Sequence, residues 1–430
     1  MDIGRTVERF APLLLALPFL IGIAVLRGLT VEIDTFHGSD AAVYQLPTIL
    51  QLRDGLHFSD YTSAQTPLFH LVMAGWGKLV GFELWKLRLL NVAISYGAAL
   101  ALLRLLRRTT SLAALPAFAL TLAFALSPYF FGASFTLLTD NLAILFALLA
   151  LERVHRYTQD GSLAAFATAC LWTGAAVLTR QSLLWLVLVA GVFLVVRELR
   201  TPARLGAGGA MLALSLVPLA ALAIEWNGLV PPSADPASCG LCTERPGFGR
   251  DTLTLRTVGF TVGLLGVYAA LIFGPGLARR LRAAPPRPPW ALLGAAGVAG
   301  VALLLISPLE YQPLHVGKPG DAGYLWRVSE RFPTALGSSL LFWIAVPCGA
   351  VAAALLARRA GWTSLAGVYL ASVLAVALPV ALVYQKYFDP FALLALALFA
   401  RPPDLRTGWD YAGVALLCAA SVAYALSFAG

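Results

Sequence analysis

The 430-residue chain is 59% apolar and only 12% charged, whereas an ordinary soluble domain carries about 25% charged residues. These charges are too few to cover the surfaces of water-soluble domains, and the apolar residues form long blocks, so the sequence predicts an all-α polytopic membrane protein. With 31 basic and 22 acidic residues, the formal charge is +9. The basic excess lies in short clusters between apolar blocks rather than on one continuous face, which excludes a nucleic-acid binder.

Since a bilayer core of about 30 Å needs about 20 apolar residues per helix, the sequence predicts about thirteen spans. In chain order they are residues 11–30, 89–106, 111–127, 136–151, 163–179, 182–196, 207–225, 254–276, 290–306, 335–357, 361–382, 387–400 and 411–429. The first block follows Arg5 and Arg9, is long and lacks an obvious cleavage site. We therefore expect an uncleaved signal anchor.

The distribution of arginines predicts the orientation. If the N-terminus is cytoplasmic, every second loop should be basic. The arginines of those loops are Arg104/Arg107/Arg108, Arg153/Arg156, Arg197/Arg200/Arg204, Arg279/Arg280/Arg282/Arg287, Arg358/Arg359 and Arg401/Arg406. This agreement requires that residues 67–83 do not cross the membrane, so we expect an interfacial or re-entrant helix there, on the outer face.

The polar residues gather on the opposite side, in the outer loops 31–88, 226–253 and 307–334 of one integral-membrane domain spanning residues 1–430. No Gly-rich phosphate loop or metal-ligand cluster stands out, so we expect no metal, no cofactor and no nucleotide-sugar site. Chemistry is therefore expected at the outer membrane surface. Cys239 and Cys242, two positions apart in the second of these loops, favour a local disulfide over half of a zinc site or a redox pair.

The first outer loop carries the best candidate for acid–base chemistry. It contains Asp34, His37 and Asp40, then an amphipathic stretch at 41–53, and Gln65 before the interfacial helix. A carboxylate just above the bilayer is well placed to deprotonate a hydroxyl group on an acceptor. The alternative is that Ser39 or Asp40 only caps the helix over residues 41–53.

Three cations lie on the outer side, against the usual charge distribution: Arg180 in a tight turn, Arg327, and Lys386 among aromatic neighbours. Together with Asp40 and Asp140, they suit an anionic lipid headgroup and a hydroxyl acceptor. Two alternatives stay open: Asp140 only complements a helix dipole, and Arg180 only snorkels to the interface.

These features resemble the GT-C superfamily of polytopic glycosyltransferases, which use polyprenyl-phosphate sugars. The shared features are a cytoplasmic N-terminus, an acidic residue in a long first outer loop, and a Thr-Pro-Leu element at residues 66–68 that leads an interfacial helix. The resemblance implies a GT-C-like bundle of transmembrane helices with interfacial helices in the first outer loop.

Within this superfamily, the chain is most similar to the family of the α-1,2-glucosyltransferase that adds the last glucose to the dolichol-linked oligosaccharide. That family has an Asp-Glu before a helix with Pro and Gln, which is similar to residues 40–51. Its other motifs occur here in the same order. They are Thr66-Pro67-Leu68-Phe69, Thr139-Asp140, Arg180-Gln181-Ser182 with Trp185, Trp226-Asn227-Gly228, His315, Asp321, Tyr324-Leu325-Trp326-Arg327, and Lys386-Tyr387-Phe388 before Pro390.

The chain also departs from that family. Ala41 replaces the second acid, and the basic, aromatic run between Asp321 and the Trp-Arg motif is shortened to Ala322-Gly323. The Ala/Leu/Arg-rich composition with short loops is typical of a bacterial or archaeal protein, so the family's large eukaryotic acceptor is not carried over.

The resemblance implies transfer of a hexose, glucose in that family, from a lipid phosphate with inversion, on the non-cytoplasmic face of a prokaryotic plasma membrane. Asp40 would be the general base, and Arg180, Lys386 and Arg327 would bind the donor phosphate. The residues that would position the sugars and the acceptor are Asp34, His37, Gln65, Asp140, Gln181, Trp226, Asn227, His315, Asp321 and Trp326. The expected partners are membrane lipids, the polyprenyl-phosphate sugar donor, and a lipid-linked glycan or other hydroxyl acceptor.

Two other classes of function stay open. A transporter or flippase of lipid-linked sugars usually needs ionisable groups near the midplane of the membrane, and the centres of these spans are essentially free of them. A non-catalytic relative that binds a lipid-linked glycan would fit the loss of the second acid at Ala41.

Overall fold

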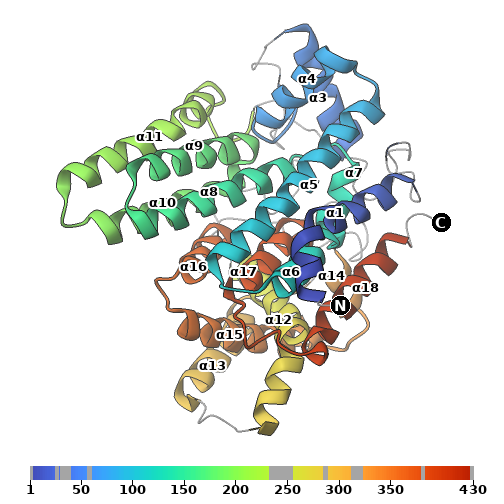
Figure 1. Ribbon diagram of the computed structural model, residues 1–430, viewed down its shortest axis with the longest axis vertical. Helices are drawn as coiled ribbons and strands as arrows, with labels where there is room; N and C mark the ends of the chain where they lie inside the picture. The colour runs from blue at the N-terminus through green and yellow to red at the C-terminus, as the bar shows by residue number, and fades with distance from the viewer. Residues whose placement is uncertain are drawn as a thin grey trace. The chain divides into compact units, whose positions relative to one another are not determined.

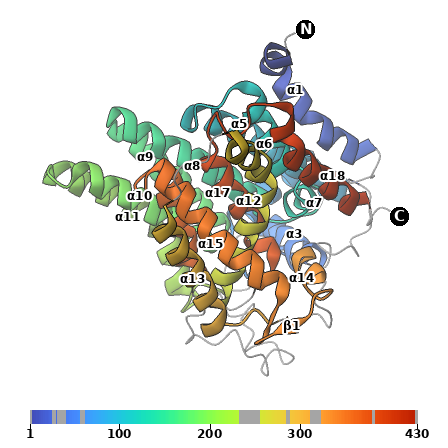
Figure 2. The ribbon, with the colours of Figure 1, turned by 90° about the horizontal axis from the view of Figure 1, so that it is seen from below.

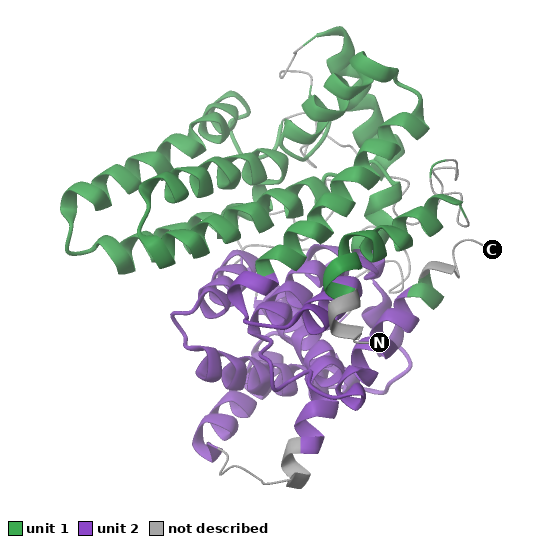
Figure 3. Ribbon diagram, in the orientation of Figure 1, with its two compact units in different colours: residues 1–105, 130–244, 422–430 green, residues 106–129, 245–421 purple. Residues whose placement is uncertain are grey.

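The computed structural model describes residues 3–24, 29, 40–55, 61–231, 255–283, 289–310, 323–378 and 383–426. Regular structure in these ranges is helical apart from a small antiparallel hairpin of β1 (Thr334–Ala335) and β2 (Ser338–Ser339) (Figure 1). The chain forms two compact units (Figure 3). Unit 1 holds residues 1–105, 130–244 and 422–430, and unit 2 holds residues 106–129 and 245–421.

Unit 1 contains the described part of the predicted first outer loop and the helices that follow it. Its elements are α1 (Ile3–Ala24), the π-helical turn η1 (Ala41–Gln45), α3 (Leu46–Asp54), α4 (Leu68–Val80), most of α5 (Leu84–Thr109), most of α7 (Pro128–Phe135), α8 (Asp140–Asp160), α9 (Leu163–Thr179), the 3-10 turn η2 (Gln181–Leu184), α10 (Trp185–Glu198) and α11 (Pro202–Glu225). Helices α8 to α11 run alongside one another (Figure 1).

Unit 2 is built around α12. Its elements are α6 (Ala114–Ala125), α12 (Leu255–Ala283), α13 (Trp290–Ile306), α14 (Tyr324–Ser329), the hairpin, α15 (Leu340–Ala360), α16 (Leu365–Ala377), the 3-10 turn η5 (Gln385–Tyr387), α17 (Asp389–Phe399), the 3-10 turn η6 (Gly408–Tyr411) and most of α18 (Ala412–Leu426). Helices α13 and α15 lie side by side in both views (Figures 1 and 2), and α12 contacts both.

Every predicted span overlaps a helix, although the bounds differ. The span predicted at 335–357 begins in the β1–β2 hairpin, and α15 starts only at Leu340. Within the described residues, six helices are long and apolar enough to cross a bilayer, and α6 with α7 makes a seventh when the two are counted as one span. This confirms an integral membrane protein. The full count of spans, the orientation and the single domain stay predictions, as does the interfacial position of α4, although its bounds agree with the predicted helix at 67–83.

Local sequence explains where several helices begin and end. Ser162 caps α9 by accepting a hydrogen bond from the amide of Ala165, and Ser364 caps α16 in the same way from Gly367. Gly161 ends α8 in the left-handed conformation, with a φ of 68°, which a residue without a Cβ adopts at little cost.

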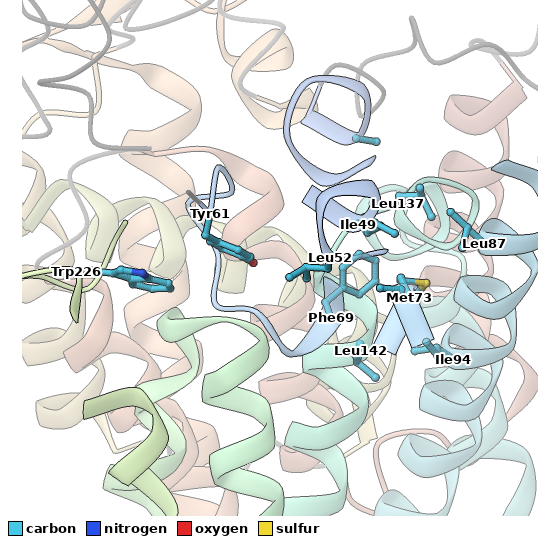
Figure 4. Packing of buried hydrophobic residues seen from close by; sticks show 12 residues of the cluster. Ile49, Leu52, Tyr61, Phe69, Met73, Leu87, Ile94, Leu137, Leu142 and Trp226 are labelled. Carbon is cyan, nitrogen blue, oxygen red and sulfur yellow. The ribbon is translucent and has the colours of Figure 1, made fainter. Parts of the chain in front are cut away.

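A cluster of buried apolar side chains packs α3 and α4 against the rest of unit 1 (Figure 4). Ile49 and Leu52 of α3 pack with Phe69 and Met73 of α4, and all four are at most 2% exposed. Leu87 of α5 belongs to the same cluster. The amphipathic stretch at 41–53 thus buries Ile49 and Leu52 against α4, while Val43 and Tyr44 stay exposed.

Unit 2 contains a close helix crossing. A Cβ added to Gly349 of α15 would overlap the carbonyl oxygen of Val262 and lie 2.9 Å from the backbone nitrogen of Gly266 in α12. A Cβ on Gly266 would in turn overlap the carbonyl oxygen of Ala345. Small residues let helix backbones approach this closely, which increases van der Waals contact between spans.

Buried acids pair with arginines at the helix ends that we predict to be cytoplasmic. The pairs are Glu152 with Arg104, Glu198 with Arg204, Asp404 with Arg359, and Asp410 with Arg279. All four carboxylates are at most 5% exposed, and each is bound by two guanidinium nitrogens. Charge-assisted bonds of this kind offset the cost of burying a carboxylate.

Candidate active site

Asp40 stands at the start of η1, with helical backbone angles, and its side chain is half-buried. The side chain makes no capping hydrogen bond to the turn that follows. The alternative that Asp40 serves only as a helix cap is therefore not supported by the geometry. The turn is π-helical, and such turns occur often at functional sites.

A buried hydrogen-bond chain lies beneath this turn. Oε1 of Gln45, at the end of η1, lies 2.5 Å from Nε2 of His70. On the other side of the ring, Nδ1 of His70 lies 2.6 Å from the hydroxyl oxygen of Tyr61. Because an amide oxygen only accepts, His70 donates from Nε2, and a neutral ring then accepts the hydroxyl hydrogen of Tyr61 at Nδ1. Burial lowers the pKa of His70 to about 3 and raises the pKa of Tyr61, in agreement with uncharged groups.

The loop between Tyr61 and α4 is tied to the end of α9. Thr66 is fully buried, and its hydroxyl donates to the carbonyl oxygen of Val177 at 2.7 Å. The side-chain nitrogen of Gln181 donates to the carbonyl oxygen of Ala64 at 2.7 Å. The half-buried Gln65 lies between these two anchors, so residues 64–66 are held against the turn that carries Arg180.

Arg180 and Asp140 form an ion pair in which Nη1 donates to Oδ1. Their side chains are 11% and 22% exposed. Asp140 begins α8 and Arg180 follows the last residue of α9, so the packing of these two helices brings the pair together. The pair shows that Asp140 does more than complement the dipole of α8, and it fixes the direction of the guanidinium.

Trp226 closes the other side of the loop. Its ring is 3% exposed and stacks on Tyr61, with ring centres 5.7 Å apart and planes at 16° (Figure 4). Asn227 follows it, exposed and with a φ of 50°, a region that Asn tolerates better than most residues. In this structure Trp226 supports the loop, and its predicted role in sugar binding stays a prediction.

The remaining described candidates belong to unit 2. Arg327 is exposed on α14, and Trp326 beside it is buried, with its indole nitrogen donating to the carbonyl oxygen of Val383 at 3.0 Å. The ammonium of Lys386 lies over the rings of Tyr384 and Tyr387, at 5.8 and 5.4 Å from their centres. Such cation–π contacts hold a lysine without removing its charge.

Some predicted residues lie outside the described ranges: Asp34, His37, His315, Asp321, Cys239 and Cys242. Within those ranges, no group of three His, Cys, Asp or Glu side chains is arranged to hold a metal ion.

Sequence reasoning missed the partners beneath these residues. His70 is a lone histidine in an apolar helix, a pattern that gives no sign of Gln45 or Tyr61 as its neighbours. The buried Arg88 of α5 and the buried Asp389 of α17 were not singled out either, although an ionisable residue in an apolar block is a usable signal.

Residues 64–226 match the family described as Dolichyl-phosphate-mannose-protein mannosyltransferase. The matched segment begins at the loop anchored by Gln181, includes the pair of Asp140 and Arg180, and ends at Trp226. It identifies the protein as a glycosyltransferase. The expected enzyme class is thereby confirmed, while the narrower likeness to the α-1,2-glucosyltransferase family stays a prediction. The segment covers somewhat over a third of the chain and leaves out Asp40.

Two solved structures of ArnT from Cupriavidus metallidurans are similar to this glycosyltransferase. The structure bound to undecaprenyl phosphate has 17% identity and a TM-score of 0.43, over 95% of this chain and 77% of that chain. The apo structure has 18% identity and a TM-score of 0.37, over 88% and 72%. Both TM-scores are below 0.5, so these structures do not show which ligand this chain binds. No curated protein sequence matches the chain significantly.

Proposed function

We propose that this protein is an inverting glycosyltransferase that moves a hexose from a polyprenyl-phosphate donor to an acceptor hydroxyl on the non-cytoplasmic face of a prokaryotic plasma membrane. The observation that carries the proposal is the family match over residues 64–226, which contains the pair of Arg180 and Asp140. The polar network of unit 1 supports it, because it holds the turn that begins at Asp40 next to buried, neutral groups.

In this mechanism Asp40 accepts the proton of the acceptor hydroxyl as its oxygen attacks the anomeric carbon. The bond from that carbon to the donor phosphate oxygen breaks, and the polyprenyl phosphate leaves with the electron pair. Arg180 stabilises the negative charge that develops on this phosphate. One displacement, with base and leaving group on opposite sides of the sugar, inverts the configuration.

Asp140 has a supporting role in this scheme. It binds one side of the Arg180 guanidinium, and a guanidinium has five N–H donors in a planar fork. Asp140 therefore limits rotation of the side chain and fixes the direction of the fork that would meet a phosphate. The predicted phosphate-binding role of Lys386 and Arg327 belongs to unit 2 and has its own test below.

The test uses the purified chain with a panel of polyprenyl-phosphate hexoses that includes glucose and mannose, beside nucleotide-sugars. We expect turnover of one lipid-phosphate donor, and we expect Asp40→Asn to lower kcat by about 10²–10⁴-fold, the usual contribution of a general base. Asp54→Asn is the matched control, because Asp54 ends the same helical segment, is exposed and pairs only locally with Arg53. The control should keep wild-type kcat.

Turnover that survives Asp40→Asn in the folded protein would contradict the assignment of the base. Binding of lipid-linked sugars without any transfer would favour the non-catalytic relative. Movement of the intact donor across a vesicle membrane, again without transfer, would favour a flippase.

A further inference from the structure

A hydrogen-bond network in unit 2 centres on Asp389, the first residue of α17. The side chain is fully buried, and three donors converge on Oδ1: the hydroxyl of Tyr268, the hydroxyl of Tyr324 at 2.9 Å, and the side-chain nitrogen of Gln385 at 2.9 Å. The second oxygen, Oδ2, is buried and has no hydrogen-bond partner among the described residues. Such an arrangement is costly, because a buried carboxylate loses its hydration.

This network joins two segments, each of which carries a predicted phosphate-binding cation. Gln385 belongs to η5 and is followed directly by Lys386. Tyr324 begins α14, three residues before Arg327. One oxygen of Asp389 thus accepts hydrogen bonds from both segments that carry the cations.

The same two segments are joined at two further points. The side-chain oxygen of Gln385 accepts from the backbone N–H of Leu325 at 2.8 Å, and the indole nitrogen of Trp326 donates to the carbonyl oxygen of Val383 at 3.0 Å. Gly323 lies so close to Gln385 that a Cβ added there would overlap its side chain. Residues 323–326 and 383–389 therefore pack closely and are linked by several hydrogen bonds.

We propose that Asp389 is a positioning residue for donor binding, which acts by fixing Lys386 and Arg327 so that both face one anionic lipid phosphate. The proposal rests on the function proposed above. Because Asp389 is itself fully buried, its proposed role is to position the two cations rather than to touch the donor. Its Oδ1 accepts from three neutral donors, and two of them, Tyr324 and Gln385, belong to the segments that carry the cations.

The first test is the substitution Asp389→Asn, which keeps the shape of the side chain and removes its charge. Since the cations bind the donor in ground and transition state alike, we expect KM for the polyprenyl-phosphate hexose to rise about tenfold, with kcat changed by less than about twofold. The affinity of the free polyprenyl phosphate should fall by a similar factor. A variant that merely loosened the fold would lower the active fraction, and thus kcat, without this division between the two constants.

The second test asks whether the effect passes through Lys386. Lys386→Gln should raise KM by itself, and Asp389→Asn in that background should add much less than it does alone, because residues that act through one another are not additive. If the two effects simply multiply, or if Asp389→Asn leaves KM unchanged, the proposal is overturned.

Asp404→Asn is a control of matched burial in the same unit. Asp404 is also fully buried, but it pairs with Arg359 in a separate ion pair. We expect this variant to lower the unfolding temperature at least as much as Asp389→Asn while leaving KM unchanged. If Asp389→Asn does not fold, Tyr324→Phe removes one donor without opening a cavity, and KM should then rise about threefold.

The result for the wild-type chain separates the two proposals. If the wild type neither transfers sugar from any polyprenyl-phosphate hexose nor binds it, the proposed function fails and this inference fails with it. If the wild type does transfer sugar and the Asp389 and Tyr324 variants keep its KM, only the inference fails.

Discussion

The crossing of α12 and α15 makes a sharp prediction about stability. Gly349→Ala adds one methyl group where there is no room for an ordinary van der Waals contact. The new carbon would lie only 2.8 Å from the carbonyl carbon of Val262 and 2.9 Å from the backbone nitrogen of Gly266. These neighbours are backbone atoms and cannot rotate away, so the two helices must separate. Such overpacking costs about 1–3 kcal/mol of folding free energy.

A matched control comes from α13 in the same unit. Apart from its own helix, Gly294 has no described atom within 4 Å of the position that a Cβ would take, so Gly294→Ala meets open space. Alanine favours a helix over glycine by about 1 kcal/mol, so this variant should be neutral or slightly more stable. Both substitutions change glycine to alanine in an apolar helix, and the expected difference of about 2–4 kcal/mol between them comes from the crossing alone.

The assay is thermal unfolding of the purified protein in detergent, followed by loss of the monodisperse peak in size-exclusion chromatography. Gly349→Ala should unfold several degrees below the wild type, and Gly294→Ala should not. Equal unfolding temperatures for the two variants would refute the close approach of α12 and α15.

Two further predictions concern single polar groups. Thr66→Val keeps the volume of the side chain but removes its buried hydrogen bond to Val177, so it should cost about 1–2 kcal/mol, measured as a lower unfolding temperature in detergent. Burial alone would raise the pKa of Asp410, but hydrogen bonds from two backbone amides and from Arg279 lower it overall. A carboxylate whose folded pKa is depressed stabilises the protein above its unfolded pKa of about 4, and this stability is lost as the pH falls below that value. Asp410→Asn should therefore lower the unfolding temperature at neutral pH and weaken its decline in acid, whereas an unchanged acid profile would contradict the role of this pair.

Much of the helix layout could be predicted from the sequence, because apolar blocks of suitable length have few other ways to satisfy their backbone in a bilayer. The same reasoning missed α7, which begins at Pro128 in what was read as a gap between two spans. Proline is favoured in the first turn of a helix, so the residue that suggested a break also fits a new start.

The site was predictable only as separate pieces. Charge placement indicated Arg180 and Asp140 individually, but their pairing depends on how α8 and α9 pack. The neighbours of His70 were hidden for the same reason, since Gln45 lies 25 positions away and shares no periodic pattern with it. Contacts between distant segments are set by tertiary packing, which one sequence without its structure does not reveal.

The arginines held by buried acids at the predicted cytoplasmic helix ends have consequences for biogenesis. While the chain is being inserted, its helices have not yet packed, and an arginine such as Arg359 acts as a full positive charge that keeps its loop from being translocated. Once α15 and the segment around Asp404 have come together, the same charge is neutralised by its partner. Arg359 thus first helps to orient the chain in the membrane and later stabilises the packed helices. Replacing Asp404 should leave insertion intact and impair only the completed fold, whereas replacing Arg359 should impair both.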